Sequence, residues 1–200
     1  MTDPATIALK TALRLEARNR RKGLLVEHPE ADWMAADRVG EMLSALKIRR
    51  EGTIALYKAI GAEIDPRPLG DTLAKQGWWL CLPAVTDPEG PLTFRAWKPG
   101  DRLAPDLSAL PAPMSTAAEV QPDLILVPLL AFDRTGGRLG QGGGHYDRTL
   151  EALRAGGLAP PAIGFAYSGQ EVPRLPREPH DQPLDGILTE AGYIAVRKDY

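Results

Sequence analysis

Hydrophobic positions recur along the chain at two spacings, one typical of helices and one typical of strands. Over residues 5–26 they follow the period of a single helix face, which predicts an amphipathic helix. The side chains expected on its apolar face are Leu9, Leu13, Ala17 and Leu24. A second helix is predicted over residues 30–50, and its apolar set comprises Trp33, Val39, Met42, Leu43 and Leu46. Shorter helices are predicted over residues 65–77, which begin with Asp-Pro and end at a glycine, and over residues 146–155.

Short apolar runs between these helices predict strands. They cover residues 52–57, 78–85, 92–97, 123–132, 162–167 and 193–196. The run over 123–132 is apolar on both faces, which is typical of a strand in the middle of a parallel sheet. Strands that alternate with helices predict an α/β protein with a largely parallel sheet. Two stretches without such a pattern, the Pro-rich residues 98–122 and residues 176–185, are expected to be irregular loops.

Composition and charge limit the partners that we expect. The 200 residues, 44% of them hydrophobic, suit a single domain over 1–200. A net charge of −2 gives the whole molecule no attraction to nucleic acid or to an anionic membrane, so neither is expected as a partner. With Cys81 as the one cysteine, no internal disulfide is possible. Because there is also no signal-peptide pattern and no apolar run of roughly 18 residues, we expect a cytoplasmic protein. We further expect a monomer or a weak homo-oligomer.

The stretch RLGQGGGHYDR, residues 138–148, concentrates glycines between two arginines after an apolar strand. Glycine inside a regular element costs roughly 0.5–1 kcal/mol relative to alanine, so such a cluster indicates a close approach to the backbone. Successive N–H groups of a glycine-rich turn before a helix form an anion site, and Arg138 and Arg148 offer bidentate phosphate contacts. The stretch is neither a Walker A loop nor a dinucleotide fingerprint. Phosphate binding is favoured over the alternative, a tight strand–helix connection without a ligand.

One side of the first predicted helix is basic, and it carries Lys10, Arg14, Arg18 and Arg21. A run of charges of this kind is usually a solvated helix face, and an RNA-binding arm is a further interpretation. Because the basic side borders the apolar face, some of these side chains are also placed to reach a neighbouring site.

Acidic residues in loops beyond the strands are candidates for a metal or substrate site. Asp147 and Asp181 match the one or two carboxylates that a nucleotide-bound Mg²⁺ takes, or serve only as a helix N-cap and a turn residue. Glu63 follows a strand end and either binds a donor-rich substrate or caps a turn. Cys81 lies in an apolar run and is expected in the core. The sequence has no serine nucleophile elbow and no His or Cys cluster with zinc spacing.

Several longer motifs resemble the 5-formyltetrahydrofolate cyclo-ligase family. The likeness covers nearly the whole chain and is most specific in the glycine-rich signature. The motifs are KTALRLEARNRR (10–21), GAEIDPRPL (61–69), LVPLLAFDRTGGRLGQGGGHYDRTL (126–150), IGFAYSGQ (163–170) and EPHDQPLDGILTE (178–190).

The resemblance implies a three-layer α/β/α fold and an enzyme that converts 5-formyltetrahydrofolate and ATP, with Mg²⁺, to 5,10-methenyltetrahydrofolate, ADP and phosphate. It implies an ATP site made of Lys10, Arg14, Arg138, Leu139, Gly140, Gln141, Gly142, Gly143, Gly144, His145 and Tyr146. Asp147 and Asp181 would hold the metal. The folate site would comprise Lys58, Glu63, Gln141, Gly142, Gly143, Gly144 and His145. Because the formyl oxygen is activated by phosphorylation, the implied reaction needs no side-chain nucleophile.

Some segments depart from the family's usual pattern, most of all residues 105–116, which read PDLSALPAPMST. The alternative function is therefore a divergent relative that keeps the nucleotide loop without cyclo-ligase activity. Such a relative would be a binding or regulatory module, or would transfer phosphate to another small carbonyl or amide. Nucleotide binding without folate binding would favour this alternative.

Overall fold

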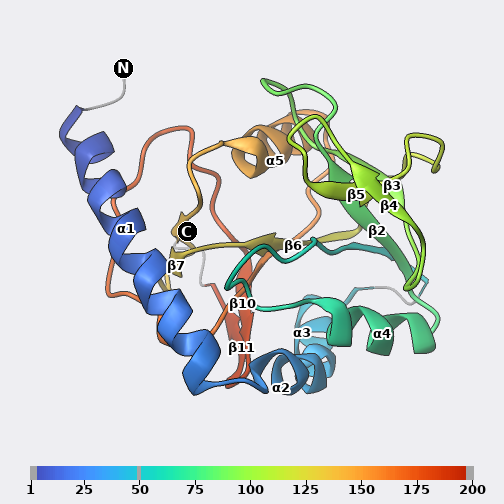
Figure 1. Cartoon of the computed structure of the whole chain (residues 1–200), viewed down its shortest axis with the longest axis horizontal. Helices are drawn as coiled ribbons and strands as arrows, with labels where there is room; N and C mark the ends of the chain where they lie inside the picture. The colour runs from blue at the N-terminus through green and yellow to red at the C-terminus, as the bar shows by residue number, and fades with distance from the viewer. Residues whose placement is uncertain (1–3, 49–50, 197–200) are drawn as a thin grey trace.

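A seven-stranded sheet forms the middle of the protein in the computed structural model, which describes residues 4–48 and 51–196 (Figure 1). In spatial order its strands are β11 (Gly192–Ala195), β10 (Gly186–Thr189), β9 (Ala162–Phe165), β6 (Leu124–Pro128), β1 (Thr53–Ala55), β2 (Trp79–Ala84) and β3 (Thr93–Ala96). The five inner strands run parallel, and the two edge strands run antiparallel to their neighbours. The predicted largely parallel sheet is confirmed.

Helices cover both faces of this sheet and complete three layers. One face carries α2 (Ala31–Asp37), α3 (Val39–Leu46) and α4 (Arg67–Lys75), and the other carries α5 (His145–Ala155). Successive residues of a strand point to opposite faces, so each face has its own core. Ile54 packs with Leu69 and Leu73 of α4, whereas its neighbour Ala55 packs with the group that includes Leu150 of α5.

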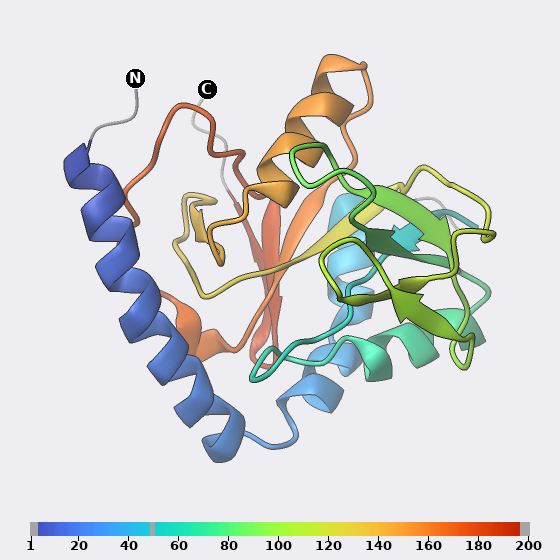
Figure 2. The same cartoon turned by 45° about the horizontal axis from the view of Figure 1, so that its top comes forward.

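The first helix, α1 (Pro4–Glu27), runs along one side of the molecule instead of lying on a sheet face (Figure 2). It contacts the short 3₁₀ helix η1 (Ser168–Gln170), where Leu24 packs so closely that a Cβ at Gly169 would lie 2.5 Å from its Cδ2. Leu9 was expected to face inward, but it is half exposed, and the buried residues of α1 are Lys10, Arg21 and Leu24. No helix in the described part of the chain is long and apolar enough to span a membrane.

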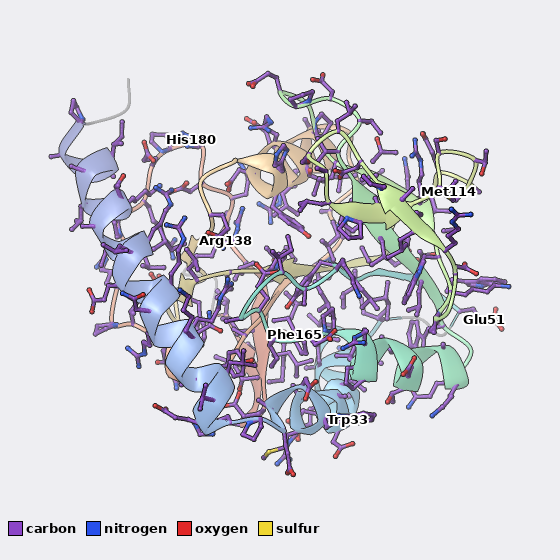
Figure 3. The ribbon with its side chains drawn as sticks, viewed as in Figure 1. Trp33, Glu51, Met114, Arg138, Phe165 and His180 are labelled. Atoms are coloured by element: carbon purple, nitrogen blue, oxygen red, sulfur yellow. The ribbon has the colours of Figure 1, made fainter. Side chains whose placement is uncertain are left out.

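The prediction of one helix over 30–50 is wrong, because α2 and α3 are separate helices that meet at Arg38. The second of them ends at Lys47, whose φ of 52° lies in the left-handed region, and residues 49–50 lie outside the described residues. Trp33 was also misplaced: it is 62% exposed on α2, whereas Met42 is fully buried (Figure 3). The break could not be predicted from the spacing of apolar residues, because the buried residues of both helices pack into the same core.

Short strands account for the other differences. The stretch 98–122 is not irregular throughout, because β4 (Leu103–Pro105) and β5 (Pro111–Pro113) form a hairpin. The predicted strand over 123–132 divides into β6 and β7 (Ala131–Phe132), and β7 pairs with β8 (Arg138–Leu139). The sequence analysis did not identify β8, η1 or the parallel strand β10. Runs of two to four residues are too short for a period to be recognised.

Strand order reverses between β1 and β6. The chain passes from β1 to β2 on one side, and later from β6 to β9 on the other. The helices that follow these strands, α4 and α5, cover opposite faces, so the loops at the carboxyl ends of β1 and β6 diverge. In parallel α/β sheets this is the place where ligands bind.

Candidate functional site

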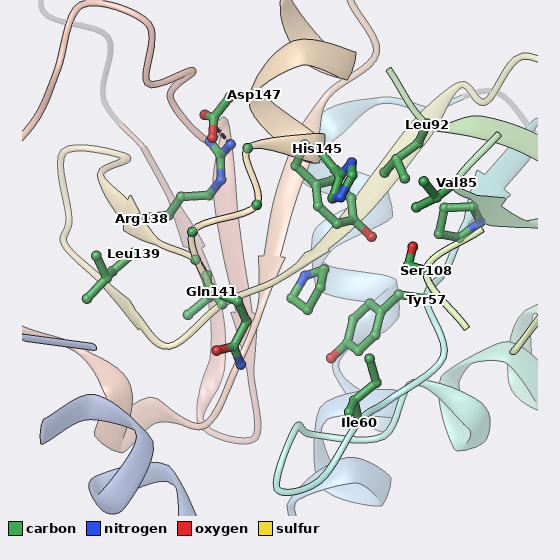
Figure 4. A pocket seen from close by; sticks show the side chains of 18 of the residues that line it. Tyr57, Ile60, Val85, Leu92, Ser108, Arg138, Leu139, Gln141, His145 and Asp147 are labelled. Atoms are coloured by element: carbon green, nitrogen blue, oxygen red, sulfur yellow. Dashed lines mark hydrogen bonds and ion pairs between the residues drawn. The ribbon is translucent and has the colours of Figure 1, made fainter. Parts of the chain in front are cut away.

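A cavity of about 400 Å³ opens beyond the carboxyl ends of β1, β2 and β6 (Figure 4). Tyr57, Val85 and Leu129, each just past the end of one of these strands, line it. The structure brings together every residue that the family resemblance assigned to a site. The cavity is lined by Lys10, Arg14, Lys58, Glu63, Arg138, Leu139, Gly140, Gln141, Gly142, Gly143, Gly144, His145, Tyr146, Asp147 and Asp181.

The glycine loop joins β8 to α5 and has a backbone that few other residues can adopt. Gly142 has a φ of +106° and Gly144 a φ of +68°, both in the region where L-residues are strained. A Cβ at Gly142 would lie 3.4 Å from the guanidinium carbon of Arg14. No side chain of the described residues caps the N-terminus of α5, whose N–H groups are therefore available to an anion.

The two arginines that flank the loop have different surroundings. Arg138 lines the cavity and donates to the backbone carbonyl of Gln182 and to the Asp147 carboxylate. Arg148 was considered as a phosphate ligand, but it donates to the carbonyls of Pro88, Gly90 and Gly143. It is not among the residues that line the cavity. Its guanidinium instead holds the glycine loop against the turn that follows β2.

The basic side of α1 faces the site, so the interpretation as a solvated helix face is wrong for its buried members. Lys10 and Arg21 are 5% and 6% exposed. Lys10 lies between two carboxylates, 2.7 Å from Glu178 Oε2 and 2.6 Å from Asp181 Oδ2. Arg14 Nε donates to the Gly140 carbonyl at 3.1 Å. Arg18 Nε donates to Gln141 Oε1 at 3.0 Å, so the whole basic side contacts the site.

Asp147 and Asp181 occupy neighbouring parts of the cavity wall but have different partners. Asp147 Oδ1 accepts the backbone N–H of Gln182 at 3.0 Å in addition to Arg138. Asp181 Oδ2 accepts the N–H of Glu178 at 2.8 Å in addition to Lys10. Both carboxylates are therefore oriented by backbone as well as by a cation. Both side chains also line the cavity, so neither serves only as a helix cap or a turn residue.

Glu178 and His180 are site residues that the sequence analysis missed. Ligand atoms of Glu178, His180 and Asp181 lie within 4.8 Å of one another, and His180 lies on the side of the molecule where α1 runs (Figure 3). Glu178 Oε1 is buried and has no hydrogen-bond partner among the described residues. The hydrogen bond from Lys10 lowers the pKa of Glu178, so this carboxylate is ionised. The motif EPHD contains both residues, but spacing alone gave them no role.

The other half of the cavity is largely apolar and has a buried carboxylate. Glu63 Oε1 lies 3.3 Å from Arg21 Nη1, and its Oε2 accepts the Ile60 N–H at 3.0 Å. Burial raises the pKa of Glu63, and Arg21 opposes that rise. Burial likewise raises the pKa of Tyr57, whose neutral hydroxyl donates to the Ile64 carbonyl at 2.6 Å. Figure 4 shows Tyr57, Ile60 and Val85 together on this side.

The hairpin β4–β5 closes this apolar half and was also missed. Its turn contributes Asp106, Ser108 and Leu110 to the cavity wall. Asp106 Oδ2 accepts the Val85 N–H at 2.8 Å, which ties the turn to the end of β2. His145 lies between the two halves; burial and the nearby Arg148 lower its pKa, so the imidazole is neutral at neutral pH. The position of the hairpin could not be predicted from a sequence period, because it depends on a hydrogen bond between Asp106 and Val85, which are 21 residues apart.

Fold and cavity together define an α/β protein with a glycine-rich loop and an uncapped helix N-terminus at the reversal of its strand order. The chain belongs to the 5-formyltetrahydrofolate cyclo-ligase family, whose model matches residues 6–190. It is 31% identical to 5-formyltetrahydrofolate cyclo-ligase of Escherichia coli over 86% of this chain and 95% of the relative. It is 37% identical to the enzyme of Mycolicibacterium smegmatis over 78% and 82% of the two chains.

Solved structures show the same relationship. The NMR structure of Aquifex aeolicus 5,10-methenyltetrahydrofolate synthetase has a TM-score of 0.76 and 29% identity, and the match covers 96% of this chain and 95% of that one. A 5,10-methenyltetrahydrofolate synthetase from Mycoplasma pneumoniae has a TM-score of 0.69 and 26% identity, over 90% and 98% of the two chains. The resemblance seen in the sequence motifs is confirmed.

Proposed function

We propose that this protein is a 5-formyltetrahydrofolate cyclo-ligase that uses ATP and Mg²⁺ and releases 5,10-methenyltetrahydrofolate, ADP and phosphate. The observation that carries the proposal is the division of one cavity into two halves joined by the glycine loop. One half has an uncapped helix N-terminus and cationic side chains, as a triphosphate requires. The other half is apolar and has a buried carboxylate, as a flat ring with N–H donors requires.

In the nucleotide half, the loop from Arg138 to Tyr146 would hold the phosphates through backbone N–H groups, with Lys10, Arg14 and Arg138 as cations. Asp147 and Asp181 would hold Mg²⁺, because hard cations prefer carboxylate oxygens. The unpartnered, buried Glu178 Oε1 beside them supports a cation site in this wall. When bound, Mg²⁺ neutralises charge on the phosphates during transfer.

In the folate half, Glu63 would accept N–H groups of the pterin, and Lys58 would contribute a positive charge at the rim. Gln141 to His145 would border both ligands, so that the formyl group would lie near the terminal phosphate. Tyr57, Ile60 and Leu110 would exclude water around the ring. We further propose a cytoplasmic protein, monomeric or weakly self-associating; the free thiol of Cys81 fits a reducing compartment.

The chemistry requires little covalent participation from the protein. The formyl oxygen attacks the terminal phosphorus, and the bond to ADP breaks. N10 of the folate then attacks the activated formyl carbon and loses its proton, and the carbon–oxygen bond breaks as phosphate leaves. The contribution of this chain is to position the two ligands and to stabilise charge on the transferred phosphoryl group. Arg138 suits that role because Asp147 and the Gln182 carbonyl fix its guanidinium at the loop.

The direct test follows the absorbance of the methenyl product with 5-formyltetrahydrofolate and Mg²⁺, with and without ATP. We expect product only with ATP, and a loss of at least about a hundredfold in kcat for Arg138→Ala. Arg134→Ala is the matched control, because Arg134 pairs with Glu171 on the surface and does not line the cavity. ATP binding without product from the wild-type protein would contradict the proposal and favour a divergent nucleotide-binding relative.

A further inference from the structure

The contact between Lys10 and the loop that follows η1 has a feature that nucleotide binding alone does not explain. A residue expected to bind phosphate is 5% exposed and has carboxylate partners at 2.6 and 2.7 Å. In this arrangement Glu178 and Asp181 take two of the three N–H donors of its ammonium group. Lys10 could direct its whole ammonium group to a phosphate only after these two contacts are broken.

We propose that Glu178 is a ligand of the divalent cation together with Asp181, and that Lys10 occupies the cation's position until nucleotide phosphates draw it away. This inference rests on the proposed function, because it assumes that ATP and a divalent cation bind in this cavity. Glu178 has no role among the residues that the family resemblance identified.

The first support is the geometry of the carboxylates. Oxygens of Glu178 and Asp181 both lie within hydrogen-bond distance of one atom, Lys10 Nζ, so they already converge on a single point. His180 Nε2 lies 3.9 Å from Glu178 Oε2 and 3.8 Å from Asp181 Oδ1. A cation that takes the place of the ammonium group would therefore meet two carboxylate oxygens without rearrangement of the loop. Mg²⁺ needs shorter distances, of roughly 2.0–2.1 Å, which a small shift of either side chain provides.

The second support is the unpartnered oxygen. Glu178 Oε1 is buried, the side chain is 10% exposed, and no described residue donates to this atom. A buried carboxylate oxygen without a partner costs free energy, and such an atom in a ligand cavity indicates a group that binds there. A bound cation with its waters would supply that partner. A purely structural ion pair with Lys10 would not require the second oxygen to be left unsatisfied.

The third support is the charge balance. Lys10 contributes one positive charge against two carboxylates, so these three side chains together carry a net negative charge. A divalent cation balances both carboxylates, and the displaced ammonium group then has the phosphates as its nearest available anions. Arg14, one turn further along α1, already contacts the glycine loop at Gly140. Lys10 therefore needs only a change of rotamer on its flexible stem to reach a ligand on that loop.

Competition between Lys10 and the cation for one position predicts how removing Lys10 changes cation binding. Removing Lys10 should improve cation binding in the absence of nucleotide, because the cation no longer competes with the ammonium group. We would measure Mn²⁺ binding by electron paramagnetic resonance on the full-length protein without ATP. We expect Lys10→Met to bind Mn²⁺ at least about tenfold more tightly than the wild type, and Lys10→Met/Glu178→Gln to lose that gain. A Lys10→Met variant that binds Mn²⁺ no better than wild type, or a double variant that keeps the gain, would overturn the inference.

A second arm guards against a Lys10→Met variant that fails to fold. With a non-hydrolysable ATP analogue present, Glu178→Gln should weaken Mn²⁺ binding about tenfold or more, since it removes one anionic ligand while keeping the side-chain shape. Glu171→Gln is the control, because Glu171 pairs with Arg134 outside the cavity and should bind Mn²⁺ as the wild type does. Equal Mn²⁺ binding by Glu178→Gln and wild type would reject Glu178 as a ligand while leaving the proposed function intact. A wild-type protein that binds neither the analogue nor Mn²⁺ would instead reject the proposed function itself.

Discussion

Glu63 and Arg21 form an ion pair in which both side chains are about 93% buried. Taking two charges out of water is costly, and removing one partner leaves the other uncompensated at a cost of about 3–5 kcal/mol. The pair belongs to the site, because Glu63 lines the cavity and Arg21, which does not line it, holds the Glu63 carboxylate through this ion pair. Arg21 also donates to the Leu129 carbonyl at 3.0 Å, which fixes the guanidinium at the end of β6.

Arg21→Met should shift the acidic limb of the pH profile for the folate. Burial raises the pKa of Glu63 and Arg21 lowers it, so removing Arg21 raises that pKa further. The carboxylate that accepts pterin N–H groups is then lost at a higher pH as the solution is acidified. We expect the acid limb of kcat/KM for the folate to move to higher pH, with KM for ATP nearly unchanged.

The control for this measurement is Arg38→Met, which removes an exposed arginine that pairs with Glu41 and does not line the cavity. The raised pKa of Glu63 in the folded state also makes the free energy of unfolding depend on pH. Stability falls as pH rises from the unfolded-state pKa through the folded-state pKa of Glu63, and the fall should be steeper in Arg21→Met. An unchanged acid limb in the variant would mean that Glu63 does not bind the folate as a carboxylate.

Two glycines of the loop differ in both backbone conformation and surroundings. Gly142 has a φ of +106° and faces the Arg14 guanidinium, whereas a Cβ at Gly140 would meet nothing within 4 Å. Gly142→Ala should lower the free energy of unfolding by about 1–3 kcal/mol and weaken ATP binding, because alanine is strained in that conformation. Gly140→Ala should change the free energy of unfolding by less than about 0.5 kcal/mol. Denaturant unfolding of both variants checks this, and equal losses would mean that the loop conformation is not what these φ values describe.

At the scale of elements, the hairpin β4–β5 depends on one side chain. Asp106 accepts N–H groups from Val85, Ser108 and Leu110, so its carboxylate both forms the turn and ties it to β2. Asp106→Ala should loosen the wall of the apolar half and raise KM for the folate several-fold, while KM for ATP stays close to the wild-type value. Asp101→Ala is the control: Asp101 also accepts a backbone N–H in a turn, at 2.8 Å from Lys98 N, but lies outside the cavity. Equal effects on both substrates would show that the hairpin does not belong to the folate half.

Elements with a clear period could be predicted from the sequence, and shorter ones could not. The helices α1, α4 and α5 have 24, 9 and 11 residues, and their predicted bounds agree with the structure to within two residues. Strands β8 and β10 have two and four residues and are positioned by their neighbours: β10 pairs with β9 over Gly186 to Leu188. The break between α2 and α3 also depends on packing, since Arg38 is not a helix breaker by type.

At the scale of the whole molecule, α1 connects parts of the chain that are far apart in sequence. Lys10 reaches residues 168 and 171 positions away, and Arg14 reaches the glycine loop 126 positions away. Ligand binding at that loop should therefore order α1. We expect ATP analogue and Mg²⁺ to slow amide hydrogen exchange in the part of α1 around Lys10 and Arg14, with little change in α3, which has no residue in the cavity. Unchanged exchange in α1 would mean that its basic side does not contact the nucleotide.

How much of the site could be predicted depends on how far apart its residues lie in the sequence. The glycine loop and Asp147 are contiguous in sequence, so a motif identifies them together. The partners of Lys10 and Arg21 depend on how α1 crosses the molecule, and that crossing is set by packing contacts such as Leu24 on Gly169. The sequence therefore suggested a solvated basic face where the structure has buried ion pairs. Glu178 was missed because its role requires Lys10 beside it.

Phosphoryl transfer to the formyl oxygen is the central claim, and isotope transfer tests it most directly. 5-Formyltetrahydrofolate labelled with a heavy oxygen isotope in the formyl group would be converted with unlabelled ATP in unlabelled water, and the released phosphate analysed by mass spectrometry. We predict that each phosphate carries one labelled oxygen, because the formyl oxygen leaves bound to phosphorus. Unlabelled phosphate formed together with methenyl product would contradict the account, since the formyl oxygen would then have left by another route.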